Sequence, residues 1–144
     1  MRHSGIGSLV FTALFATVML AAAGMEGDII LLYVVLQTAI QATAVVVHEL
    51  AHLVCARAFG VRATLYWHPV PTVICQDIGS GAARAVAIVG PVCGAAFGVA
   101  ALCMVISLFH ASALLYAIPA AIGGSHLAML SPRMADGRLL CMRI

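Results

Sequence analysis

Residues 29–59 read IILLYVVLQTAIQATAVVVHELAHLVCARAF, and this is the longest apolar stretch around the motif that ends it. No charge occurs between Ile29 and Val47. About 20 apolar residues are enough for a helix to cross the hydrocarbon core of a bilayer. The stretch therefore predicts a membrane-spanning helix. Gln37 and Gln41 fall on the same face of this helix as the two histidines near its end, so a polar stripe is expected on it.

The end of the stretch carries the motif His48-Glu49-Leu50-Ala51-His52. On a helix, HExxH places two imidazoles on one face, where both can bind one zinc ion, and the glutamate between them can act as general base. Ionisable residues inside a membrane segment are costly and mark functional sites by default. The alternative is a structural histidine pair. We expect one Zn²⁺ per chain, bound by His48 and His52, with Glu49 as the catalytic residue.

Composition agrees with a membrane protein, because 64% of the 144 residues are hydrophobic and only 8% are charged. We expect a single membrane-embedded domain over residues 1–144. The net charge of +2 is small and dispersed, which argues against nucleic-acid binding. Five cysteines without a CxxC pair do not suggest a disulfide framework.

The chain as a whole predicts an all-α membrane protein with about four transmembrane helices. The predicted spans are residues 4–25, 29–59, 85–109 and 113–130. The first could instead be a cleaved signal peptide, because Arg2 precedes an apolar segment that ends in small residues. In the third, Gly90, Gly94 and Gly98 recur every four residues, which predicts close helix packing.

Between spans two and three, Gly60 is expected to end the helix. Residues 61–67 alternate apolar and polar side chains, prolines follow, and residues 72–76 are again extended in character. This pattern predicts a short β-hairpin-like segment. Its edge, with Thr64 and Tyr66, could hold an extended substrate by main-chain pairing; the alternative is a hairpin that only packs on the bundle.

The basic residues orient the predicted bundle. All seven are arginines, at positions 2, 57, 62, 84, 133, 138 and 143. They lie at the N-terminus, at the end of span two and in the loop after it, and in the C-terminal tail, so the positive-inside rule places both termini and the hairpin in the cytoplasm. We expect a multi-pass protein of the plasma (inner) membrane. The HExxH motif and Asp136 then lie on the same side of the bilayer.

A catalytic zinc ion usually has three protein ligands, so a third must come from elsewhere. Asp136 is the first candidate, Asp77 the second and His126 the third, although His126 could simply pack between helices.

With these pieces in order, the chain resembles the site-2 protease family of intramembrane zinc metalloproteases. The resemblance rests on the HExxH motif, on Gly90-Pro91 in the third span and on the Asp136-Gly137-Arg138 tail. It implies that His48, His52 and Asp136 bind zinc and that Glu49 is the general base. It also implies that the segment after the HExxH helix forms a small sheet that receives substrate.

One position departs from the family pattern. Ala128 stands where the family usually has an asparagine that steadies the substrate or the oxyanion, which leaves that role to Ser125, His126 or Ser131. No segment is long enough for a PDZ or CBS domain.

The sequence thus predicts an intramembrane metalloprotease that cleaves in or next to a transmembrane segment of a membrane protein. A regulatory membrane partner or a homo-oligomer is compatible with it. The alternatives are a catalytically silent relative that binds membrane partners and a polar-lined transport bundle. The second would require ionisable residues in spans one and three, and they have none.

Overall fold

The fold is taken from a computed structural model of the chain. It describes residues 10, 13–15, 17–18, 21, 24, 26–67, 71–76, 78–108, 117–134 and 136.

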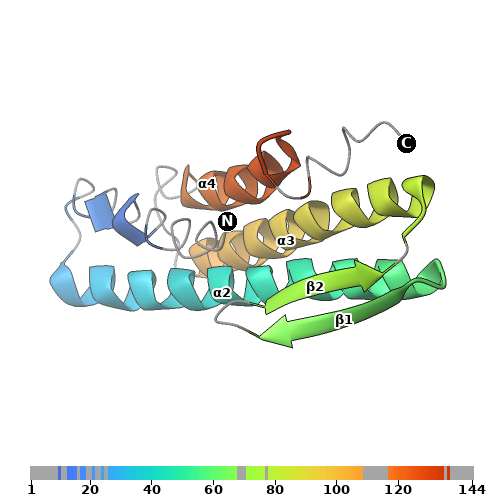
Figure 1. The fold of residues 1–144 in the computed structure, drawn as a ribbon. Coiled ribbons are helices and arrows are strands. Elements are labelled where there is room, and N and C mark those ends of the chain that lie inside the picture. Colours follow the sequence, from blue (N-terminus) through green and yellow to red (C-terminus); the bar gives the residue numbers. More distant parts are fainter. Residues whose placement is uncertain are drawn as a thin grey trace.

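Two long helices, α2 (Gly27–Ala58) and α3 (Ser80–Leu108), lie side by side and form the body of the molecule (Figure 1). A β-hairpin connects them and lies along the C-terminal half of α2. The shorter helix α4 (Ala117–Leu127) packs against α3 and continues into the 3₁₀ turn η2 (Ala128–Leu130).

Helix α2 confirms the helix predicted over residues 29–59, and Gly60 ends it as expected. The Gly60 backbone is left-handed, with φ of +72°, and its N–H donates to the Arg57 carbonyl. The Val61 N–H donates to the Ala56 carbonyl. These two bonds satisfy carbonyls at the helix end and turn the chain sharply into the first strand.

The hairpin pairs β1 (Arg62–Trp67) with β2 (Pro71–Gln76) in antiparallel register, with Leu65 opposite Val73. Both predicted extended segments are therefore confirmed. A buried cluster holds the hairpin to the ends of the two long helices and consists of Ala56, Ala63 and Val86.

Helix α3 starts earlier than the sequence indicated. The predicted membrane span begins at residue 85, after Arg84, whereas the helix that contains it begins at Ser80. Nothing between Ser80 and Arg84 breaks a helix, and an exposed arginine is tolerated in a first turn. The helix also runs through Pro91. At its other end a second cluster joins α2, α3 and α4 and consists of Tyr33, Leu102, Ile106 and Ile122.

Within the described ranges, two segments are long and apolar enough to cross a membrane, Ile30–Ala58 and Gly81–Met104. Only 22% and 44% of their most apolar windows are buried, whereas the core helix of a soluble protein would be mostly buried. Large exposed apolar side chains on the two helices include Leu31, Leu32, Val35, Val54, Ile88, Val92 and Met104.

The structure describes less of the other two predicted spans. Most of residues 4–25 lies outside the described residues. The predicted span 113–130 corresponds to α4 and η2, whose apolar part, Ala120–Leu130, is shorter than the two long segments.

Candidate metal centre

Three side chains from distant parts of the sequence meet beside α2. His48 and His52 are one helical turn apart on its buried face, and Asp136 reaches them from the segment after η2. Both histidines are buried and the carboxylate is half-buried. Asp136, the first candidate for the third ligand, therefore lies at the motif.

The distances within this group suit a single metal ion. The two Nε2 atoms are 3.0 Å apart, and the Asp136 oxygens lie 3.4 Å from His48 Nε2 and 3.5 Å from His52 Nε2. Ligand atoms bound to one zinc ion at about 2.0–2.2 Å in tetrahedral geometry lie about 3.3–3.5 Å apart. The two distances to Asp136 match this range and the distance between the two Nε2 atoms is slightly shorter, so the three side chains could hold one metal ion.

The tautomer of His52 supports the same interpretation. Its Nδ1 lies 2.6 Å from the Val86 carbonyl oxygen of α3. A carbonyl only accepts, so Nδ1 carries a proton. In the neutral ring Nε2 then presents a lone pair, which is the form that binds a metal. A lone pair that faces a second imidazole nitrogen and a carboxylate is repelled unless a cation or a proton lies between them. The geometry thus calls for positive charge where the three groups meet.

Asp136 is ionised at neutral pH. Burial on its own would raise the pKa of the carboxyl group, but the neighbouring imidazoles of His48 and His52 outweigh burial and lower the pKa to about 2. An ionised carboxylate with two imidazoles is a ligand set that zinc accepts.

Glu49 lies next to the group and is held by the hairpin. Its Oε2 accepts a hydrogen bond of 2.9 Å from the backbone N–H of Val73. The carboxylate is half-buried and turned toward β2 rather than toward bulk solvent. A glutamate held beside two histidines that could bind a metal has the placement that a general base requires.

Helix α3 comes close enough to form this site because it presents glycines there. A Cβ atom at Gly90 would overlap the ring of His52, and one at Gly94 would lie 2.8 Å from His126 Nδ1 and 3.0 Å from His48 Cβ. A Cβ at Gly98 would lie 2.8 Å from a methyl group of Ile122. The close packing predicted from the glycine spacing is confirmed, and two of these glycines make room for the histidines.

The polar stripe of α2 is buried in the bundle. Gln37 and Gln41 are at most 1% exposed, and the Gln37 Nε2 donates to the Gln41 Oε1 at 3.1 Å. This pair occupies the face of α2 that also carries His48 and His52, as the periodicity predicted.

The remaining candidate residues are dispersed. Thr64 and Tyr66 are exposed on β1. The Ser125 hydroxyl donates to the Ile122 carbonyl of its own helix, 2.8 Å away. His126 is buried, and the centre of its ring lies 5.6 Å from that of His48, but it is not one of the three residues whose ligand atoms converge. Asp77 lies outside the described residues.

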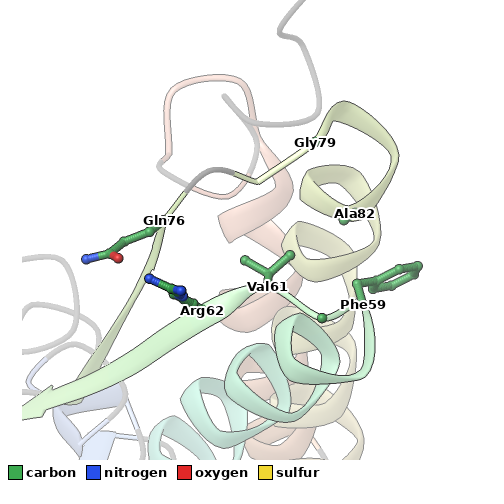
Figure 2. Close-up of a pocket in the computed structure, with 7 residues that line it drawn as sticks. Phe59, Val61, Arg62, Gln76, Gly79 and Ala82 are labelled. Carbon is green, nitrogen blue, oxygen red and sulfur yellow. The ribbon is translucent and has the colours of Figure 1, made fainter.

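A pocket of about 610 Å³ lies where α2 ends and α3 begins (Figure 2). Its lining comprises Phe59, Gly60, Val61, Arg62, Gln76, Gly79 and Ala82. None of these residues belongs to the converging group, so the pocket is separate from the candidate metal centre.

Sequence patterns could not reveal the contacts made by backbone groups. The residue type does not indicate that the Val86 carbonyl or the Val73 N–H makes such a contact, since any residue except proline has both backbone groups. The glycine spacing signalled close packing but not which side chains would fill the space. Comparison with protein-family models, curated proteins and solved structures gave no match, so the functional argument rests on the residues and their geometry.

Proposed function

We propose that the protein is an intramembrane zinc metalloprotease that hydrolyses peptide bonds in or next to transmembrane segments of membrane proteins. The observation that carries the proposal is the convergence of His48, His52 and Asp136 beside Glu49, on a helix long and apolar enough to cross a membrane. The proposal includes four spans, with both termini and the hairpin in the cytoplasm.

In this proposal, His48, His52 and Asp136 hold the metal. Zinc supplies Lewis-acid chemistry, which acidifies water and polarises a carbonyl group. Glu49 takes the proton from the attacking water and passes it to the leaving nitrogen of the scissile peptide. The hydrogen bond from Val73 keeps the Glu49 carboxylate in place for both transfers.

A transmembrane substrate must unwind before attack, because a helix hides its carbonyls in its own hydrogen bonds. The unwound backbone then needs new partners, since each unsatisfied amide in an apolar setting costs several kcal/mol. An exposed strand edge can supply these partners. The question is which edge of the hairpin does so.

The contacts favour β2. The Val73 N–H points away from β1 and donates to Glu49, and the Ala63 carbonyl points away from β2 and accepts from Arg57. The pairs Leu65–Val73 and Ala63–Cys75 are therefore not hydrogen-bonded across the hairpin. Backbone directions alternate along an antiparallel ladder, so Thr64 and Tyr66 bond inward to β2. The edge of β2 at Val73 is therefore the one next to the catalytic glutamate. Contact of the exposed Thr64 and Tyr66 side chains with substrate stays a prediction.

The proposal can be tested with purified protein in liposomes and a synthetic transmembrane peptide that carries a fluorophore and a quencher. Wild-type protein should cleave the peptide, and a zinc chelator should stop the cleavage. Glu49→Gln should lower the rate by about 10²- to 10⁴-fold, since a general base contributes a factor of this size. Cleavage that survives both the chelator and Glu49→Gln would contradict the proposal.

A silent relative that binds membrane partners is the second candidate. The observation that favours it is Ala128, which offers no amide side chain in η2. This candidate predicts that the protein retains the peptide in a pull-down from liposomes but never shortens it. The intact Glu49 favours the protease.

A further inference from the structure

The two metal-binding histidines are held differently. His52 is fixed by the bond between its Nδ1 and the Val86 carbonyl. His48 Nδ1 is buried and has no hydrogen-bond partner among the described residues. A histidine that binds a metal through Nε2 carries its proton on Nδ1, and this N–H nearly always has an acceptor. The acceptor for His48 has to be found.

His126 of α4 offers a nitrogen with a matching need. Its ring is 1% exposed, and its Nδ1 also lacks a partner among the described residues. The two rings are neighbours, with centres 5.6 Å apart and planes tilted by 39°. Two buried, unpaired nitrogens in neighbouring rings are costly unless something joins them.

Gly94 of α3 lies against both residues. A Cβ at this position would lie 2.8 Å from His126 Nδ1 and 3.0 Å from His48 Cβ, so the glycine lets α3 pack closely against the two histidines. A buried water molecule typically makes about three hydrogen bonds to polar groups that would otherwise be unsatisfied. One water suits the pair, because it can accept from His48 Nδ1–H and donate to His126 Nδ1.

We propose that His126 is a positioning residue of the metal centre, which holds the His48 ring through one water molecule shared by the two Nδ1 atoms. This inference rests on the proposed metal site but adds a residue to it. It gives His48 the support that the Val86 carbonyl gives His52, and it explains the glycine at position 94.

The test measures Co²⁺ affinity and the visible absorption spectrum of bound Co²⁺ in detergent-purified protein. The asparagine side chain can place a polar atom near Nδ1 of a histidine, whereas glutamine reaches the position of Nε2. His126→Asn should therefore stay close to wild type. His126→Gln and His126→Leu should bind Co²⁺ about 10- to 100-fold more weakly, the usual loss when a supporting partner of a metal-binding histidine is removed, and should change the spectrum.

A second pair of variants tests the close contact at Gly94. Gly94→Ala directs a methyl group at His126 Nδ1 and should weaken Co²⁺ binding to a similar extent. Gly124→Ala is the control, because a Cβ there meets nothing within 4 Å. Thermal melting of each variant shows whether it is folded.

The outcomes separate the two proposals. Wild-type affinity and spectrum in His126→Leu, or rescue by glutamine rather than asparagine, would overturn the role of His126 while the metal site stands. Wild-type protein that takes up no Co²⁺ would overturn the metal site and this inference with it.

Discussion

Gly90→Ala is predicted to disable the metal centre without touching a ligand. The added methyl group would overlap the His52 ring, so the ring must leave the position in which its Nδ1 reaches Val86 and its Nε2 faces His48 and Asp136. Overpacking of this kind costs about 1–3 kcal/mol. At about 1.4 kcal/mol for each factor of ten, zinc affinity should fall by about 5- to 150-fold.

The matched control is Gly81→Ala in the same helix, because a Cβ at Gly81 meets nothing within 4 Å. Alanine is better than glycine in a helix by about 0.5–1 kcal/mol, so this variant should be neutral or slightly more stable. Zinc affinity is measured by competition with a chelating dye in detergent, and stability by thermal melting. Wild-type zinc affinity in Gly90→Ala would refute the close approach of α3 to His52.

Two further predictions concern topology and the hairpin. Reporter fusions after Glu26 should report the outer face and fusions at Ile144 the cytoplasm, because the arginines are distributed asymmetrically. A cytoplasmic signal at Glu26 would contradict the proposed orientation of α2. Val73→Pro removes the N–H that donates a hydrogen bond to Glu49. Because a hydrogen bond to a charged group is worth about 1.5–3 kcal/mol, the turnover number should fall by about 10- to 100-fold while the zinc content stays unchanged. Cys75→Pro, at the next outward-facing position of β2, is the control, and equal turnover in both variants would remove the Val73 bond from the mechanism.

The sequence was informative wherever a period or a motif was strong. The uncharged run before His48 predicted α2, alternation predicted the hairpin, and the arginine asymmetry placed Asp136 on the side of the motif before any contact was known. Helical periodicity also gave the buried face of α2, because residues three and four apart share a side.

Other features of the site could not be predicted, because they depend on how the helices pack. Periodicity describes the faces of one helix at a time, so it could not show that His126 of α4 would lie beside His48. Helix α3 extends five residues before the predicted span, because a charge can bound a membrane span without ending the helix. The strand edge next to Glu49 belongs to β2, and edge assignment requires knowledge of which backbone groups pair.

Zinc content and cleavage, measured on the same purified samples, test the central claim most directly. Wild type and Glu49→Gln should each hold one zinc ion per chain, but only wild type should cleave the transmembrane peptide. Asp136→Ala should lose zinc because it removes a ligand, whereas Asp77→Ala should retain it. Wild-type protein without zinc, or Glu49→Gln that cleaves at the wild-type rate, would contradict a zinc metalloprotease.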